Sequence, residues 1–300
     1  PKGRWIVAGG NDDRARVFDL DAGGKRLWQS PTLGKDIDGL SSCSDTRFAV
    51  RIYGGSMRVY RRSAPAAQSF RLQRTLPHSH AWMFGLTHDC QRLISDTLKY
   101  DDYRMYDATT GGLLTTVKPQ GRFDRRGTRI RAGRLAYLDG RGQAVVLVVD
   151  GSAAGGSREV LRVAMPTTFG GRRIVQLWAV DDRTLLAEYC SSHSCVVRLH
   201  DPTGRARQQL EYDIRGSVWS ATVPSAIDVS ADGAFLAFFR DGLDMSVTRI
   251  QTGERHSLGS LRRTMSSTPM AVFSPFDPRL FAVAMRPGPN QVSLVRTRER

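Results

Sequence analysis

The chain has 300 residues, of which 40% are hydrophobic and 24% are charged, so it has the composition of a folded globular protein and not of a disordered one. No apolar run approaches the roughly 18 residues of a membrane-spanning helix, so no such span is expected. The 44 Lys and Arg residues exceed the 29 Asp and Glu residues by 15, which favours an acidic partner such as nucleic acid, lipid headgroups or protein.

A short strand pattern recurs along the whole chain. Each copy has an aromatic or branched residue near its end, and Asp and a turn containing Gly often follow, as in residues 16–19 with Gly23. The equivalent positions are Phe18, Tyr60, Tyr106, Val149, His200, Arg249 and Val295. Their mean interval of about 46 residues is typical of one four-stranded propeller blade.

A second pattern precedes most of these strands by about one hairpin. It is a polar turn followed by an apolar strand, and it occurs in residues 42–50, 87–94, 180–187, 230–237 and 274–282. Asp and Gly favour the tight turn, while alternating apolar residues favour packing between sheets. Because no helical period of 3.6 residues is found over a useful length, we expect an all-β fold.

These repeats predict a single β-propeller domain over residues 1–300, with about seven four-stranded antiparallel blades whose strands are named A to D from the centre outward. The expected blades span residues 1–33, 36–76, 79–119, 121–166, 167–213, 217–261 and 266–300. We expect the terminal blades to be incomplete, the first without strand A and the last without strand D. Propellers usually close by combining both chain ends in one blade. This sequence does not show such a combined blade, so we interpret it as a fragment of a longer protein.

Two of the patterns carry a resemblance to a known group of proteins. Residues 230–237 read Ser-x-Asp-Gly-x-Phe-Leu-Ala, and residues 17–19 read Val-Phe-Asp with Gly downstream. Both resemble the repeats of WD-repeat and related bacterial β-propellers, in a degenerate form that has no Trp-Asp dipeptide at a repeat end. Residues 18–28 are also similar to one repeat of the quinone-binding propellers.

The cysteines suggest one cross-strand pair. Cys190 and Cys195 are flanked by apolar runs that read as the two strands of a hairpin, so they are expected to face each other across it. Three interpretations stay open: a disulfide, a metal site with His193 that lacks a fourth ligand, or two packed thiols. A disulfide would indicate an extracytoplasmic, periplasmic location, and free thiols a cytoplasmic one. Cys43 and Cys90 are interpreted as isolated apolar fillers.

Motifs of known enzyme classes are not found. The sequence contains no Gly-x-Ser-x-Gly, no His-Glu-x-x-His, no phosphate-binding Gly-x4-Gly-Lys-Ser and no Cys-x2-Cys. His78 and His80 form a spaced pair without a third ligand nearby, which is more typical of solvated histidines. We therefore expect a non-catalytic protein with no cofactor and no metal.

Basic and aromatic residues gather in the connections from strand D to the next strand A. In a propeller these connections open on the same side as the turns between strands B and C. Arg offers a planar donor fork to carboxylates, and aromatic rings serve as rigid anchors. The predicted binding face consists of Lys35, His78, His80, Trp82, Arg122, Phe123, Arg125, Arg126, Phe169, Arg172, Arg173, Arg215, Trp219, Arg262 and Arg263.

A plainer interpretation of this face is a solvated surface. Phe123, Phe169 and Trp219 would then plug the channel or cap a blade, and several arginines would form surface ion pairs without any ligand.

The favoured function is a protein-interaction scaffold or sensor that binds an acidic partner, either another protein or another domain of the same polypeptide. One alternative is a propeller enzyme or a quinone-binding periplasmic protein. Another is a binder of nucleic acid or a different polyanion, which a steep salt dependence of binding would identify.

Overall fold

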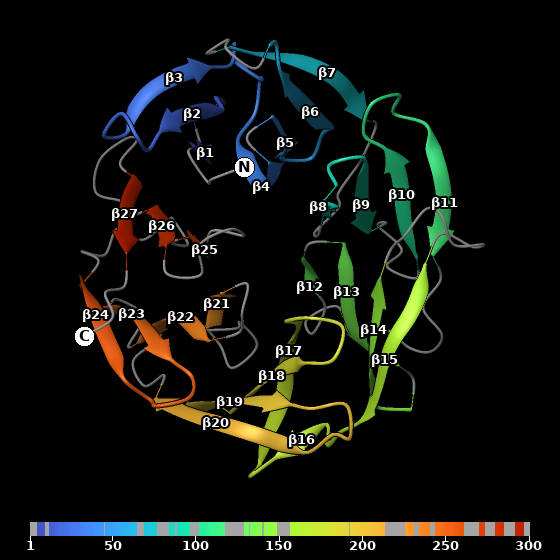
Figure 1. The fold of residues 1–300 in the computed structure, drawn as a ribbon, viewed down its shortest axis with the longest axis vertical. Coiled ribbons are helices and arrows are strands. Elements are labelled where there is room, and N and C mark those ends of the chain that lie inside the picture. The colour runs from blue at the N-terminus through green and yellow to red at the C-terminus, as the bar shows by residue number, and fades with distance from the viewer. Residues whose placement is uncertain are drawn as a thin grey trace. The chain divides into compact units, whose positions relative to one another are not determined.

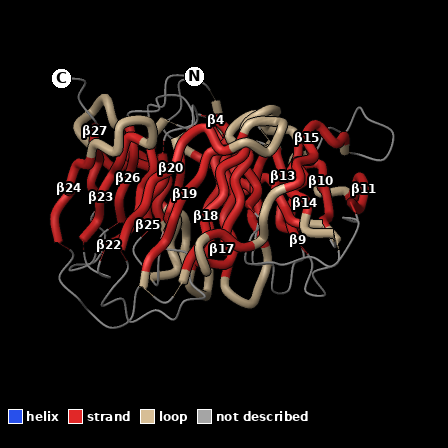
Figure 2. Tube along the Cα trace, turned by 90° about the horizontal axis from the view of Figure 1, so that it is seen from below, coloured by secondary structure: helices blue, strands red, loops and turns tan. Residues whose placement is uncertain are grey.

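The regular structure of this protein consists of β-strands. The computed structural model describes residues 5–9, 12–44, 46–64, 69–76, 84–87, 89–96, 102–117, 129–131, 133–139, 141–148, 157–191, 193–213, 226–230, 234–240, 244–260, 270–273, 280–284 and 292–296. Within these ranges every regular element is a strand (Figure 2). The described residues accordingly contain no helix that is long and apolar enough to cross a membrane.

The chain divides into two compact units, and the first holds Pro1–Phe123, Ile130–Leu135 and Leu147–Arg158. Its first three sheets follow chain order, with each strand antiparallel to the next (Figure 1). The strands are β1 (Trp5–Ala8), β2 (Arg16–Asp19) and β3 (Lys25–Gln29); β4 (Ile37–Ser44), β5 (Arg47–Ile52), β6 (Met57–Arg62) and β7 (Phe70–Leu76); β8 (Phe84–Leu86), β9 (Arg92–Asp96), β10 (Tyr103–Asp107) and β11 (Leu113–Val117).

The second unit holds Asp124–Arg129, Ala136–Val146 and Glu159–Arg300. Its sheets are β16 (Thr168–Phe169), β17 (Arg172–Ala179), β18 (Leu185–Cys190), β19 (Ser194–His200) and β20 (Ala206–Asp213); β21 (Ala226–Val229), β22 (Phe235–Arg240), β23 (Asp244–Arg249) and β24 (Arg255–Ser260); β25 (Met270–Phe273), β26 (Leu280–Ala284) and β27 (Val292–Arg296). The remaining sheet contains β12 (Arg129–Arg131), β13 (Arg134–Leu138), β14 (Gln143–Val148) and β15 (Arg158–Ala164), and the boundary between the units falls within it.

The all-β class and a propeller-like arrangement of antiparallel sheets are confirmed. The predicted count of about seven blades, the first and the last incomplete, is not confirmed. Five sheets have four or five strands, whereas the first and last have three each among the described residues, so fewer than seven complete blades are present there. Those two three-stranded sheets match the expected strands B to D at the start and A to C at the end. The single-domain organisation stays a prediction.

The inner strand β18 is buried on both faces because its sheet packs against a neighbouring sheet on each side. All six residues of β18 are buried. Leu185, Ala187 and Tyr189 contribute to the core shared with β13–β15, while Leu186 and Cys190 contribute to the core shared with β21 and β22. A strand buried on both faces has apolar residues at successive positions in place of alternation, and β18 follows this rule at every position except Glu188.

In two sheets, the polar turn that precedes the apolar strand is held by the same kind of hydrogen bond. The Thr87 hydroxyl accepts a hydrogen bond from the Arg92 backbone N–H at 3.1 Å, and the Ser230 hydroxyl accepts one from the Phe235 N–H at 2.8 Å. Both hydroxyl-bearing residues are buried, and both bonds span five residues. The same local device therefore closes the turn from strand A to strand B in two different sheets.

A disulfide joins two consecutive sheets of the first unit. It links Cys43 on β4 with Cys90 in the turn before β9, with 5.4 Å between the two Cα atoms. The buried Arg47 guanidinium donates hydrogen bonds to the Cys90 carbonyl and, at 3.2 Å, to the Thr109 hydroxyl. The interpretation of Cys43 and Cys90 as isolated fillers is therefore wrong, because the end of β4 and the turn before β9 in the next sheet bring their sulfur atoms together.

Candidate functional site

The connections from strand D to strand A lie beside the turns between strands B and C, and we call this end of each sheet the rim. In the first unit, the Tyr53 backbone N–H donates a hydrogen bond to the Asp36 carbonyl at 2.9 Å. A Cβ atom placed on Gly54 would lie 3.8 Å from the ammonium nitrogen of Lys35. Lys35 is exposed, and so is the Tyr53 side chain, at 66%. The rim here carries an exposed cation beside the turn that holds the exposed Tyr53.

In the second unit, the rim begins with the short hairpin of β16 and β17. Phe169 pairs with Arg172, and Thr168 pairs with Arg173. The Phe169 ring packs against the core of this sheet, with its centroid 6.0 Å from that of Tyr189 and 4.0 Å from the Arg198 guanidinium carbon. This packing agrees with the interpretation of Phe169 as a cap on the sheet.

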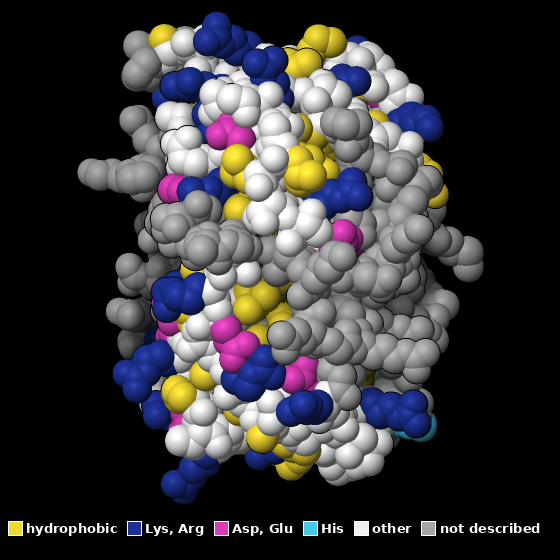
Figure 3. Space-filling view, turned by 90° about the vertical axis from the view of Figure 1, so that its right-hand side faces the viewer, with side chains coloured by type: hydrophobic (Ala, Val, Ile, Leu, Met, Phe, Trp, Pro, Cys, Tyr) yellow, Lys and Arg dark blue, Asp and Glu magenta, His cyan; other side chains and the backbone are white. Residues whose placement is uncertain are grey.

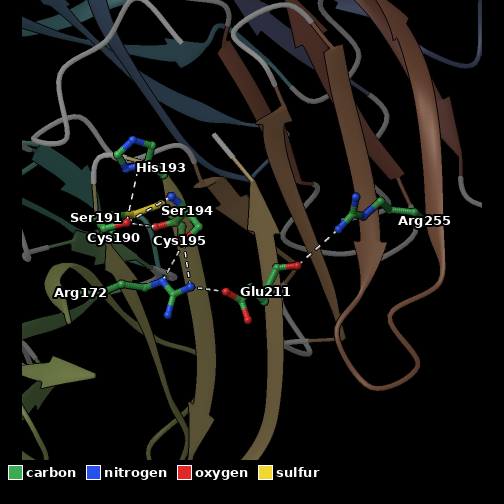
Figure 4. Close-up of polar contacts among 8 residues, drawn as sticks. All are labelled: Arg172, Cys190, Ser191, His193, Ser194, Cys195, Glu211 and Arg255. Atoms are coloured by element: carbon green, nitrogen blue, oxygen red, sulfur yellow. Dashed lines mark hydrogen bonds and ion pairs between the residues drawn. A yellow bond between two sulfur atoms is a disulfide. The ribbon is translucent and has the colours of Figure 1, made fainter. Parts of the chain in front are cut away.

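Arg172 is built into the fold by a network of polar contacts. Its Nε and Nη2 atoms donate hydrogen bonds to the Ser194 hydroxyl at 3.0 and 2.7 Å, and Nη2 also forms an ion pair with Glu211 (Figure 4). The Glu211 backbone carbonyl accepts a further hydrogen bond from Arg255 at 3.4 Å. The Arg172 side chain is only 16% exposed. Arg172 on β17 is thus linked to Ser194 on β19 and to Glu211 on β20.

Arg173 has different surroundings from Arg172. It is exposed, and its side chain makes no ion pair with another described residue. Its backbone pairs with Cys190 on β18 as well as with Thr168, so its position is fixed on both sides. Arg173 is therefore a cation on a rigid strand end, available to a partner.

A second exposed arginine of this unit, Arg141, lies on the turn between β13 and β14. A Cβ atom placed on the next residue, Gly142, would lie 3.1 Å from the Thr167 side chain. The turn therefore lies beside the connection that leads into β16 and, through Thr168, to Arg173. The sequence-based prediction missed Arg141 because it considered only the connections from strand D to strand A.

Asp139 holds the turn that carries Arg141. Its carboxylate accepts hydrogen bonds from the backbone N–H groups of Arg141 and Gln143, both at 2.9 Å, and from the Arg162 guanidinium at 2.6 Å. Burial alone would raise the pKa of Asp139, but these hydrogen bonds outweigh it and lower the pKa below its usual range. The turn is therefore fixed by an ionised, fully hydrogen-bonded carboxylate.

The hairpin of β18 and β19 carries the expected disulfide. Cys190 and Cys195 are partners in the strand register, their Cα atoms are 4.1 Å apart, and they are disulfide-bonded. The turn is closed by a hydrogen bond of 2.9 Å from the Ser191 N–H to the Ser194 carbonyl. Of the three interpretations of this cysteine pair, the disulfide is the one found, and His193 is exposed on the turn.

The rim has three further features that the prediction did not include, namely Tyr53, Arg141 and His193, all on turns between strands B and C. The turn pattern in each repeat was the signal that could have found them. The other predicted binding-face residues lie outside the described part of the chain, and these are His78, His80, Trp82, Arg122, Phe123, Arg125, Arg126, Arg215, Trp219, Arg262 and Arg263.

Positive charge is also found away from the rim. On the face in Figure 3, the described Lys and Arg side chains are spread among neutral and acidic ones. Any test of the rim therefore needs a control that removes the same charge elsewhere.

No protein-family model matches this chain, and no curated protein matches it either.

Proposed function

We propose that this protein is a non-catalytic interaction module, a scaffold or sensor, that binds an acidic protein surface through the rim. The observation that carries the proposal is the pair Arg141 and Arg173. Both side chains are exposed, and both are carried by backbone that is fixed by other residues. Both belong to the second unit: the turn that carries Arg141 lies beside the Thr167 side chain, and the next residue, Thr168, pairs with Arg173.

The ordered backbone at the two arginines and the geometry of the guanidinium group both favour binding to carboxylates. A guanidinium group donates two parallel hydrogen bonds to a carboxylate, which a lysine cannot do. Backbone that is already ordered loses little further entropy on binding. Charges at the edge of an interface act mainly on the association rate, so fast, salt-sensitive association with an acidic surface is expected.

The proposal also includes an extracytoplasmic location and a WD-repeat-like origin of the sheets. Two disulfides support the location, because such bonds persist in oxidising compartments. The equivalent hydroxyl-closed turns at Thr87 and Ser230 support the common repeat.

The test compares two double variants of the full chain. Arg141→Ala with Arg173→Ala removes two charges from the rim. Arg183→Ala with Arg205→Ala removes two charges from exposed turns at the other end of the same five-stranded sheet. The probes are a 20-residue poly-glutamate peptide and a 20-base-pair DNA duplex, each labelled for fluorescence anisotropy.

We expect the rim variant to bind the acidic peptide about three- to tenfold more weakly, since each exposed pair contributes up to about 1 kcal/mol, while the control changes less than about twofold. Equal losses in both variants would mean that only net charge matters, and would contradict the proposal. Rim-dependent binding of the duplex with no peptide binding would favour the nucleic-acid alternative instead.

A further inference from the structure

We propose that Glu188, Cys190 and Cys195 form a binding site for a thiophilic divalent cation such as Zn²⁺ when the Cys190–Cys195 disulfide is reduced. One carboxylate oxygen and two sulfur atoms lie within 4.8 Å of one another, and all three residues are buried. This site does not depend on the acidic partner or on the rim arginines.

The strand geometry brings these three groups together. Glu188 and Cys190 are two residues apart on β18, so their side chains are on the same face of the sheet. Cys195 is the register partner of Cys190 on β19, and the Glu188 carboxylate lies 3.7 Å from the Cys190 sulfur. The turn between the cysteines is closed by its own hydrogen bond, so the two strands stay paired without the disulfide.

The spacing suits tetrahedral zinc. With Zn–S bonds of about 2.3 Å, two thiolates on a tetrahedral ion lie about 3.8 Å apart. The two Cα atoms are 4.1 Å apart, so rotation of the two side chains after the S–S bond breaks gives this separation without moving the backbone. The third ligand is the carboxylate, and the fourth position is left for water, as in other sites with three protein ligands.

Glu188 also fits a cation site on energetic grounds. It is 0% exposed, and its neighbours on this face, Leu186 and Cys190, belong to an apolar core. Gln176, its register partner on β17, is buried as well. A dication bound here would place a positive charge next to this buried carboxylate, which favours its ionised form.

Cys190, His193 and Cys195 have a Cys-x2-His-x-Cys spacing, for which the sequence shows no fourth ligand. The fold places the Glu188 carboxylate beside the two cysteines. Glu188 lies outside the spacing, two residues before Cys190, and only the alternation of β18 shows that it faces the cysteine pair. His193, in contrast, is exposed on the turn beside the disulfide (Figure 4).

The change from the disulfide to the metal-bound state takes two steps, reduction and metal binding. A dithiol reductant transfers two electrons and two protons to the disulfide, giving two thiols and the oxidised, disulfide form of the reductant. Binding of the dication then releases the two thiol protons as two metal–sulfur bonds form. The disulfide and the metal use the same two sulfur atoms, so the two states exclude each other, and each crosslinks β18 to β19.

The experiment uses Co²⁺ as the probe, because thiolate ligation gives it a strong charge-transfer absorption. The full chain is reduced with a phosphine, which takes up an oxygen atom from water as it reduces the disulfide, and is then titrated with Co²⁺ under anaerobic conditions. We expect one Co²⁺ per chain with thiolate charge transfer, and displacement of this signal by Zn²⁺. The oxidised chain should give no signal.

Variants assign the ligands. Cys190→Ser should abolish the two-thiolate spectrum, and Glu188→Gln should weaken Co²⁺ binding at least about tenfold. Cys43→Ser is the matched control, since it removes a thiol of the other disulfide, and it should leave the titration unchanged. A reduced wild-type chain that shows no charge transfer would overturn the proposal, and so would a spectrum that survives Cys190→Ser.

Discussion

Cys43 at the end of β4 and Cys90 in the turn before β9 form a disulfide between two consecutive sheets, and their sequence separation of 47 residues nearly equals the repeat interval of about 46. The bond therefore fastens one repeat to the next. The Cys190–Cys195 disulfide, with a separation of five residues, fastens only the two strands of one hairpin.

This difference predicts unequal contributions to stability. In the loop-closure estimate, a crosslink over 47 residues is worth about 4 kcal/mol and one over five residues about 2 kcal/mol. We expect Cys43→Ala with Cys90→Ala to lower the free energy of unfolding by about 2 kcal/mol more than Cys190→Ala with Cys195→Ala. Urea denaturation followed by circular dichroism measures both, and the reverse order would contradict the assignment.

Arg172 and Arg173 are neighbours in sequence but differ in role. Arg172→Ala removes the hydrogen bonds to Ser194 and the ion pair with Glu211, so we expect a loss of about 1 to 2 kcal/mol in the free energy of unfolding. Arg173→Ala removes an exposed side chain and should change stability by less than about 0.5 kcal/mol. Equal effects in urea denaturation would mean that the network around Arg172 is not formed.

The buried His200 is expected to make the free energy of unfolding depend on pH. It is 1% exposed, and burial lowers the pKa of its imidazole, with the Arg198 charge acting in the same direction and the Gly204 carbonyl opposing it. The ring donates from Nδ1 to that carbonyl at 3.0 Å, and its Nε2 has no hydrogen-bond partner among the described residues. The neutral ring is therefore favoured in the folded state.

Because this pKa is depressed on folding, the unfolded chain binds the proton more readily. The stabilisation is complete above the unfolded pKa of about 6.5 and is lost as the pH falls below it. We expect the free energy of unfolding to fall more between pH 7.5 and 5 in the wild type than in His200→Gln, by up to about 1.4 kcal/mol for each pH unit. Identical losses in the two proteins would exclude this role of His200.

Position 204 requires glycine because of both the backbone conformation there and the atoms that surround it. Its φ is +83°, and a Cβ atom there would lie 2.6 Å from the Ala164 carbonyl oxygen. We expect Gly204→Ala to cost at least about 2 kcal/mol of stability, because strain and collision add together. Gly253, with φ of +69° and open space around it, is the control, and Gly253→Ala should cost only about 1 to 2 kcal/mol. Equal costs would show that the contact with Ala164 is absent.

The sequence predicted what depends on local pattern. The all-β class followed from the repeats, and the pairing of Cys190 with Cys195 followed from a hairpin whose register is set by a short turn. Long-range pairings were harder. The partner of Arg172 is Glu211, which lies 39 residues further on, and its identity depends on the register of β19 with β20.

Two errors in the candidate site have a common physical origin. Cys43 and Cys90 were treated separately although they lie close to the same turn of two adjacent repeats, and similar positions of adjacent repeats are neighbours in space. Arg141 was missed because the turns between strands B and C were recognised as part of the face but not searched for charged residues. The position within the repeat determines that Cys43 meets Cys90 and that Arg141 lies on the rim, and the residue type alone does not show either.

The most direct test of the interaction proposal is a footprint of the bound peptide on the chain. Hydrogen–deuterium exchange with mass spectrometry is carried out on the full chain with and without the 20-residue poly-glutamate peptide. We predict slower exchange in residues 139–142, 168–173 and 191–194, and no change in residues 180–184 and 201–205 at the other end of the five-stranded sheet. Protection that is confined to the latter segments, or that is equal at both ends, would contradict the rim as the binding surface.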